Sequence, residues 1–541
     1  MGGLGEPAVT ALPRLWRWAW GGVAAVLLAG CLADPDASVV APGPQAGVDV
    51  LETIAEVRLE PETLRMGARA ALVVRHPDTL GTLVLGLDDA LEVRAVRVDG
   101  RDAAFDRDGD ALRVALATPT SRFAAGRGGT TTSVVEVVYR GTPVAGLYAG
   151  EHGGQRVVYT DGWPDRTAGW LVGVHHPSDP VRLDLTLDVP AASEVVASGA
   201  AVFDSIAGGR RVARFVLSRP APLYTAAFAV GDFDVVEGGA AGGGAVAVRH
   251  ALVAGSAARA GRLARTGAAL DTLAALLGPY PYATYATVQV PMRYAGMENA
   301  AAPFLRADLY DADAPGRNAV EEVNFHELAH QWWGNEVVPA SWRDLWLSEG
   351  PATYLTTELV RRLDGDDAAR RHLVLMTRQI SAADAAAPLV PGPLDDPADV
   401  LSATVYNKGG AVLHLLRQTL GDDVFWPAFR RVGEAYADRP LSTEAFQRAL
   451  EAETGRDLGD VFRVWVYGRG LPALRTRWDR RTRTLTWAVE GDGGTLDGVP
   501  FELYVRQGGV GRFVPASDGG LGLPGEAAPT VEPVGLLLDV E

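Results

Sequence analysis

The sequence has a single cysteine in 541 residues, so no disulfide bond can form within the chain. Lysine is equally rare: Lys408 is the only one, and nearly all positive charge resides on arginine. Acidic residues outnumber basic ones by 67 to 50, which gives a formal net charge of −17. This leaves no basic stripe to neutralise phosphates and argues against nucleic acid as a partner. The acidic residues are spread along the chain, which favours solubility over substrate steering as their role.

The chain is long enough for three or four domains, and no internal repeat divides it. Hydrophobic residues make up 48% of the sequence and charged residues 22%, proportions typical of a folded soluble protein. The change of pattern along the chain predicts a multidomain α+β protein with folded units at 49–250, 251–472 and 473–541.

The first thirty residues have the features of a secretory signal. Arg14 and Arg17 precede a brief apolar run, which closes as Leu28-Ala29-Gly30-Cys31. This ending resembles a bacterial lipobox, which implies cleavage before Cys31 and attachment of lipid to that residue. We therefore expect a signal peptide at 1–30, a lipid-anchored linker at 31–48, and a membrane-attached position in the bacterial cell envelope, outside the cytoplasm. The alternative is an uncleaved signal anchor with an incidental cysteine.

Short alternating apolar runs separated by glycine and aspartate predict an antiparallel β domain over 49–250. The expected strands are Ile54–Leu59, Ala70–Arg75, Leu91–Val98, Leu112–Leu116, Ser133–Tyr139, Val181–Val189, Val212–Leu217 and Val246–Ala251. A small β module is expected over 473–541, with strands Leu474–Trp478, Thr482–Val489, Phe501–Val505 and Gly535–Val540.

Between these β regions lies a pattern of metal-binding side chains. His326-Glu327-Leu328-Ala329-His330 places two imidazoles four residues apart, on one face of a helix. Glu349, eighteen residues beyond this motif, would complete three protein ligands from a second helix and leave a fourth position open, as in catalytic zinc sites. Glu327 lies beside the first ligand and can reach a water on the metal. The pattern predicts one zinc ion per chain.

The five-residue motif also occurs by chance on ordinary amphipathic helices. Here Asn318 with Glu321 forms a capping pair before it, and Gly334 is a stop signal after it. The expected buried stripe consists of Val320, Val323, Leu328 and Ala329. Together with the spacing to Glu349, these features favour a metal site over a chance match.

Longer motifs around the ligands resemble the zinc aminopeptidases of the aminopeptidase N type, which include the leukotriene hydrolases. The resemblance is carried by His330-Gln331-Trp332-Trp333-Gly334-Asn335 and by Trp342-Arg343-Asp344-Leu345-Trp346-Leu347-Ser348-Glu349-Gly350. Ser348 stands where the family usually has Asn, and Pro351 where it usually has Phe. The resemblance implies a saddle-shaped N-terminal β domain and a thermolysin-like mixed α/β catalytic domain.

Tyr294-Ala295-Gly296-Met297-Glu298-Asn299 resembles the family's Gly-Ala-Met-Glu-Asn motif, with the two small residues in the reverse order. Small residues on an edge strand let a peptide backbone approach and pair there. The resemblance assigns Ala295, Gly296, Met297, Glu298 and Asn299 to substrate binding, with Glu298 holding the substrate's α-ammonium. The alternative is an ordinary solvated carboxylate at a strand end.

Tyr406, at the start of an apolar helix, matches the family's Tyr-x-x-Gly segment. The resemblance implies that its hydroxyl stabilises the oxyanion, while Glu327 acts as the general base and zinc activates the water. The expected substrates are then peptides with a free N-terminus. Two alternatives remain open: a zinc hydrolase for a non-peptide substrate such as an epoxide, and a non-catalytic peptide-binding surface lipoprotein. The adjacent His175 and His176 point to opposite faces if they lie on a strand, so a joint metal site there is not expected.

Overall fold

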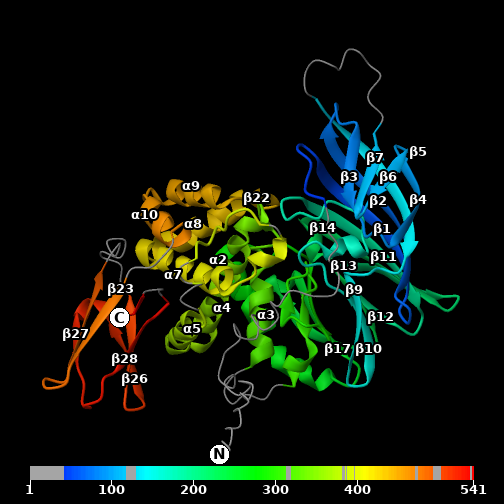
Figure 1. Ribbon diagram of the computed structural model, residues 1–541. Coiled ribbons are helices and arrows are strands. Elements are labelled where there is room, and N and C mark those ends of the chain that lie inside the picture. The colour runs from blue at the N-terminus through cyan, green and yellow to red at the C-terminus, as the bar shows by residue number, and fades with distance from the viewer. Residues whose placement is uncertain are drawn as a thin grey trace, which may run out of the picture.

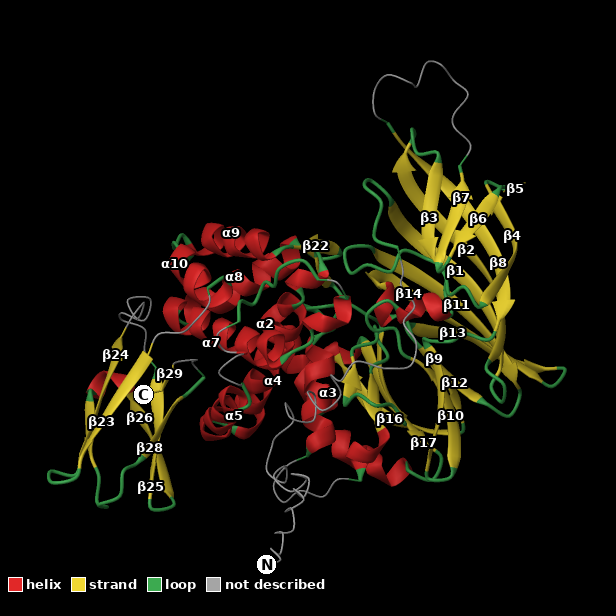
Figure 2. Cartoon of the chain, viewed as in Figure 1, coloured by secondary structure: helices red, strands yellow, loops and turns green. Residues whose placement is uncertain are grey.

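In the computed structural model, helices occupy the middle of the chain and strands dominate both ends (Figures 1 and 2). The structure describes residues 42–116, 129–311, 318–380, 384, 387–394, 396–468, 473–490, 501–535 and 539–540. The expected signal peptide, Cys31 and most of the expected linker lie outside these ranges. Within them, no helix is both long enough and apolar enough to span a membrane.

An eight-stranded sheet forms the centre of the N-terminal β domain, in the order β13-β14-β11-β1-β2-β8-β4-β5. Its strands are β1 (Asp49–Glu60), β2 (Arg65–Pro77), β4 (Leu91–Val98), β5 (Arg101–Asp102), β8 (Thr130–Gly141), β11 (Pro180–Pro190), β13 (Ala200–Ala207) and β14 (Arg210–Pro222). Buried and exposed residues alternate along β1 from Thr53 to Glu60, which gives the sheet one core face. The one departure from an antiparallel sheet is the pair β1 and β11, which run parallel; the long stretch of chain between them permits the crossover that a parallel pair needs.

Two smaller sheets complete this domain, in the orders β12-β15-β10-β9 and β3-β7-β6. Their strands are β3 (Thr82–Gly86), β6 (Phe105–Asp108), β7 (Ala111–Ala115), β9 (Leu147–His152), β10 (Gln155–Thr160), β12 (Glu194–Ala197) and β15 (Phe228–Gly231). Most of them were not predicted, since strands of four to six residues carry little alternation.

The middle region of the chain contains a five-stranded mixed sheet in the order β16-β17-β18-β20-β19. Its strands are β16 (Phe233–Ala241), β17 (Val246–Val253), β18 (Thr284–Val290), β19 (Gly296–Met297) and β20 (Phe304–Arg306). β17 spans the boundary that we expected at residue 250, and it pairs in parallel with β18. β19 is an edge strand, bonded only to β20 among the described strands.

Helices pack beside this sheet and form the middle of the molecule (Figure 2). They are α2 (Thr266–Leu277), α3 (Ala319–Ala329), α4 (Trp346–Asp364), α5 (Asp366–Arg378), α7 (Gly409–Leu420), α8 (Asp422–Ala435), α9 (Thr443–Thr454) and α10 (Gly459–Val461). A short parallel pair, β21 (Val337–Pro339) and β22 (Arg439–Leu441), lies among them.

The expected capping pair at the start of α3 is wrong. The Asn318 side-chain amide instead donates to the carbonyl of Arg262 at 2.5 Å, and Glu321 accepts from Arg265 at 2.9 Å. The segment before α2 packs against the start of α3 and supplies these partners, so tertiary contacts replace the local cap. Pro351 lies inside α4, beyond its first turn.

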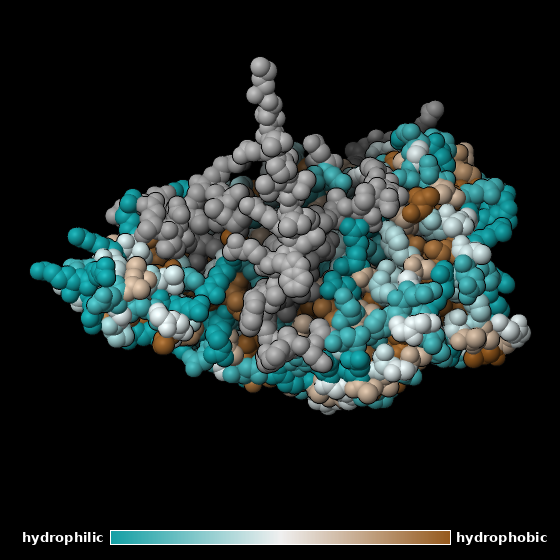
Figure 3. Space-filling view, turned by 60° about the horizontal axis from the view of Figure 1, so that its bottom comes forward, coloured by the Kyte–Doolittle hydropathy of each residue, from teal (hydrophilic) through white to brown (hydrophobic). Residues whose placement is uncertain are grey.

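The C-terminal module contains two small sheets, β27-β24-β23-β29 and β26-β25-β28. Their strands are β23 (Ala473–Asp479), β24 (Thr484–Glu490), β25 (Glu502–Gln507), β26 (Val510–Pro515), β27 (Gly520–Gly522), β28 (Thr530–Pro533) and β29 (Asp539–Val540). Ion pairs join the module to α5: Arg370 to Glu502 at 2.6 Å, and Arg378 to Glu532 at 2.7 Å. Among the coloured residues in Figure 3, hydrophilic ones predominate and hydrophobic ones form small patches. The architecture confirms the predicted fold class.

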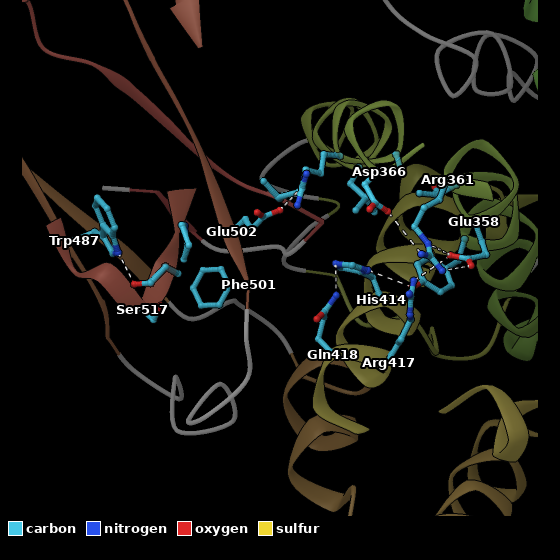
Figure 4. Close-up of a pocket in the computed structure, with 18 of the residues that line it drawn as sticks. Glu358, Arg361, Asp366, His414, Arg417, Gln418, Trp487, Phe501, Glu502 and Ser517 are labelled. Atoms are coloured by element: carbon cyan, nitrogen blue, oxygen red, sulfur yellow. Dashed lines mark hydrogen bonds and ion pairs between the residues drawn. The ribbon is translucent and has the colours of Figure 1, made fainter. Parts of the chain in front are cut away.

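A cavity of about 790 Å³ separates the module from α4, α5 and α7 (Figure 4). Its helical wall is polar and includes Glu358, which pairs with Arg361 and Arg417. Its other wall is largely apolar and includes Trp487 and Phe501. None of the predicted site residues lines this cavity, although it is far larger than the cleft that they line.

Candidate metal centre and substrate cleft

Helices α3 and α4 bring the three predicted metal ligands together. The Nε2 atoms of His326 and His330 are 3.0 Å apart, and each is 3.2 Å from Oε2 of Glu349. The imidazoles come from one face of α3 because they are four residues apart, and the carboxylate comes from the first turns of α4. All three side chains are buried.

The donor set suits a zinc ion. Two donors bound tetrahedrally to one zinc at about 2.0–2.2 Å lie about 3.3 Å apart, close to the spacing found here. Neutral imidazole and carboxylate are ordinary zinc ligands, and three of them leave a fourth position open. Without a cation, two imidazole nitrogens and a carboxylate oxygen cannot all form good hydrogen bonds to one another within so small a triangle. The residues therefore fit the ion that the sequence predicts.

A second layer of contacts orients His330. Its Nδ1 lies 3.1 Å from the carbonyl oxygen of Trp333 and 3.1 Å from Oγ of Ser348, which leaves Nε2 for the metal. Gly334 makes room for this arrangement, since a Cβ there would lie 2.5 Å from Ser348 Oγ and its φ is +128°. Ser348, at the family's usual Asn position, thus retains a polar contact to the histidine.

Glu327 lies against the backbone of the edge strand β19. A Cβ on Gly296 would come within 2.0 Å of Oε1 of Glu327, so the carboxylate fills the space that glycine leaves. Burial raises the pKa of Glu327 well above its usual value, and the nearby Glu298 and Glu349 carboxylates add to the effect. A carboxylate in this environment readily holds a proton, as a general base in a hydrolase must.

Glu298 ends the edge strand with its carboxylate directed toward the metal centre. One of its oxygens lies within 4.8 Å of ligand atoms of Glu327 and His330, and its Oε1 is buried with no partner among the described residues. Asn335 and Gln331 fix its backbone by donating to the Glu298 carbonyl at 2.8 and 3.3 Å. Burial raises the pKa of Glu298 to about 6. The arrangement leaves a carboxylate oxygen available for a cationic group of a ligand.

Tyr406 lies in a π-helical turn, Thr404–Lys408, directly before α7. Its ring stacks on that of His326, with centroids 6.0 Å apart, and it lines the same cleft as the metal ligands. Lys408 does not line this cleft: it is buried and donates to the carbonyl of Ala387. The only lysine therefore has a structural role.

Comparison with known proteins agrees with this geometry. Residues 267–465 match the family model described as Peptidase family M1 domain. This segment, just over a third of the chain and here called the M1 domain for its likeness, resembles the peptidase domain of that family. Both zinc-ligand helices, Glu298 and Tyr406 fall inside the matched segment.

Relatives extend the likeness beyond the M1 domain. Aminopeptidase M1-B of Oryza sativa subsp. japonica is 28% identical over 322 residues, which are 56% of this chain and 36% of that protein. The chain thus spans just over a third of the length of this curated relative. An M1 zinc metallopeptidase from Deinococcus radiodurans has a TM-score of 0.68 at 27% identity, over 79% of this chain and 95% of that one. A variant of that enzyme, bound to a Tyr-Ser-Ala substrate, has a TM-score of 0.68 at 28% identity, over 79% of this chain and 96% of that one.

Several residues around the cleft were not assigned to it from the sequence. Tyr224, from the N-terminal β domain, places its hydroxyl beside Glu298 and Ser348, and Trp163 from the same domain lines the cleft. Leu401 closes another side. No motif marks these residues, because they reach the site only when the β domain packs against the M1 domain. Conversely, Asn299 is buried and does not line the cleft.

The two adjacent histidines lie apart from the metal centre. His175 Nε2 is 3.3 Å from the carbonyl of Gly86, whereas His176 Nδ1 is 2.7 Å from Oγ of Ser178. Burial lowers the pKa of both to about 4, so both are neutral near pH 7. Neither belongs to a group of potential metal ligands among the residues that the structure describes.

A close contact between two glycines sets the distance between α4 and α7. A Cβ on Gly350 would lie 3.0 Å from the carbonyl carbon of Gly409, and a Cβ on Gly409 would lie 3.0 Å from Cα of Gly350. Gly350 directly follows the ligand Glu349, and Gly409 comes three residues after Tyr406. The contact therefore places the third ligand and the tyrosine relative to each other.

We expect Gly350→Ala to lower both zinc affinity and activity, because the added methyl group must push α4 away from α7. Overpacking of this kind costs about 1–3 kcal/mol of stability, and a shift of about 1 Å at a catalytic group costs about a hundredfold in rate. Zinc titration and thermal denaturation measure the two effects. Gly433→Ala on α8 is the matched control, because its Cβ would make only ordinary contacts at 3.7 Å. Unchanged zinc affinity and activity in Gly350→Ala would show that the contact does not position the site.

Proposed function

We propose that the protein is a zinc aminopeptidase that removes the N-terminal residue from peptides. The observation that carries this proposal is the buried carboxylate of Glu298, which lies next to the metal centre with one oxygen unpartnered among the described residues. A carboxylate so placed cannot attack the bond, but it can bind the ammonium of a substrate whose first carbonyl lies at the metal. An endopeptidase has no need of such a group.

His326, His330 and Glu349 would hold the zinc ion. When bound, the ion would lower the pKa of a water toward neutrality and polarise the scissile carbonyl. Glu327 would take a proton from that water on its carboxylate and pass it to the leaving amine. The Tyr406 hydroxyl would donate to the oxyanion, and such a donor contributes about 3–4 kcal/mol in comparable sites. Glu298 would fix the α-ammonium, so that only the first peptide bond reaches the reacting groups.

Two further observations support a peptide as substrate. The edge strand β19 offers unpaired backbone groups beside the metal centre, where an extended chain can add as a further strand. In addition, the similar Deinococcus radiodurans enzyme has been crystallised with a tripeptide substrate, and the curated rice relative is named an aminopeptidase. Neither observation favours an epoxide or a purely non-catalytic role.

The reaction itself is tested with aminoacyl fluorogenic substrates. We expect turnover in the zinc-loaded protein, loss of turnover with a chelator, and recovery when zinc is restored. Glu327→Gln should keep zinc and lose activity by about 10²–10⁴-fold, since it removes the group that accepts the proton. Metal analysis of the same samples separates loss of zinc from loss of chemistry. An active Glu327→Gln variant would contradict the assigned base.

The exopeptidase assignment is tested at Glu298. Glu298→Ala should lower kcat/KM for free-amine substrates by about a hundredfold, because a charge-assisted hydrogen bond in a dry cleft is lost. Zinc content should be unchanged, and Glu298→Gln should be nearly as impaired because it keeps the shape but not the charge. Acetylated peptides should be poor substrates of the unaltered protein. Equal cleavage of acetylated and free peptides would rule out the aminopeptidase assignment.

We further propose that Cys31 anchors the mature protein to a membrane of the bacterial cell envelope. The support is the Leu28-Ala29-Gly30-Cys31 sequence after a short apolar run. Cys31→Ser should release the protein from the membrane fraction or leave an uncleaved precursor. Mass spectrometry of the protein from its bacterial host provides the check. An unmodified cysteine, or an intact Met1, would refute the lipid anchor.

A further inference from the structure

The cleft beside the metal centre is very small. Twelve residues enclose a volume of about 40 Å³. A water molecule needs about 10–15 Å³ measured in this way, so the cleft holds about three waters. Pockets for larger ligands usually measure about 300–1,000 Å³. Whatever enters between the metal centre and the walls must therefore be compact.

Half of the twelve lining residues already have chemical roles: Glu298, His326, Glu327, His330, Glu349 and Tyr406. Ala295 and Gly296 contribute little more than backbone. The remaining walls are Trp163, Tyr294, Met297 and Leu401. Since Glu298 would bind the ammonium and the metal centre the carbonyl, these four side chains are left to face the side chain of the first residue.

Trp163 is the largest of these walls and is held firmly in place. It is 5% exposed, and its ring meets Tyr224 edge-on at 5.4 Å and Trp342 edge-on at 4.9 Å. Trp342 is backed in turn by the ring of His176 at 6.2 Å. Because rings of the β domain and of the M1 domain pack on it, Trp163 has no space to swing aside for a bulky substrate.

The four walls also carry no charge. Two guanidinium groups lie behind these walls: that of Arg166 contacts Asp161 at 2.8 Å and the Tyr294 hydroxyl at 3.2 Å, and that of Arg293 lies over the Tyr294 ring at 5.3 Å. A charged first side chain packed against these four walls would thus be taken out of water without a countercharge on any of them, which is strongly unfavourable.

We propose that Trp163 restricts the enzyme to peptides whose first residue has a small, uncharged side chain, such as alanine, glycine or serine. This inference rests on the proposed aminopeptidase function and names its substrate class. It makes Trp163 a specificity-determining residue contributed by the N-terminal β domain, not by the M1 domain that holds the zinc ligands.

The test compares fluorogenic amides of alanine, phenylalanine and arginine with the full, zinc-loaded chain. We expect kcat/KM for alanine to exceed that for phenylalanine at least tenfold in the unaltered protein. Trp163→Ala should raise the phenylalanine-to-alanine ratio at least tenfold, mainly through KM, while arginine stays poor for lack of a countercharge. Trp163→Leu opens less space and should give an intermediate ratio, and it is available if Trp163→Ala does not fold. Trp487→Ala, in the C-terminal module, is the control and should leave the ratio unchanged.

Calorimetric binding of alaninamide and phenylalaninamide to the zinc-loaded chain provides a readout that does not need turnover. Alaninamide should bind tighter to the unaltered protein, and the preference should be lost in Trp163→Ala. Preference for phenylalanine in the unaltered protein, or unchanged ratios in both Trp163 variants, would overturn the inference. Absence of turnover with every amide, despite selective binding of alaninamide, would instead count against the proposed function and leave the size limit supported.

Discussion

The contact between α3 and α4 concentrates ionisable groups that are almost fully buried. Two imidazole nitrogens and a carboxylate oxygen lie within 3.2 Å of one another, and two further carboxylates, Glu298 and Glu327, lie close by. Burying such groups costs free energy unless each finds a partner. The surrounding fold must therefore hold them in place against their tendency to separate.

The restraints come from several parts of the chain. The carbonyl of Trp333 and the hydroxyl of Ser348 orient His330, while Gln331 and Asn335 pin the backbone of Glu298. Glycines permit the closest approaches: Gly296 admits the carboxylate of Glu327, and Gly350 admits α7. Side chains with a Cβ at these two positions would move groups that take part in the chemistry. The geometry of the site thus depends on the absence of a Cβ at these two glycines as well as on hydrogen bonds.

The sequence predicted the parts of the site that lie close together along the chain. The i, i+4 histidines, Glu349 on the next helix and the small residues before Glu298 all depend on local spacing, and the structure brings them to one cleft. The prediction failed where the interacting partners are distant in the sequence. The Asn318 side chain does not cap α3, because its amide donates to the carbonyl of Arg262, and β1 pairs in parallel with the distant β11. Trp163 and Tyr224 were not assigned to the site for the same reason. Alternation along a strand shows which face is buried but not which domain will cover it.

The charges of the cleft-lining carboxylates explain why a metal ion and the ammonium group of a substrate can bind side by side in this cleft. With neutral imidazoles, Glu298, Glu327 and Glu349 bring three negative charges when ionised, and the raised pKa values of Glu298 and Glu327 reflect the cost of keeping them so. A divalent ion offsets two of these charges and the ammonium of a substrate offsets the third. A substrate with a blocked amine would leave one carboxylate uncompensated in a buried place, and a charged first side chain would add a charge that nothing balances. The charge balance of the cleft and the bulk of Trp163 therefore favour the same substrates: peptides with a free α-ammonium and a small, uncharged first side chain.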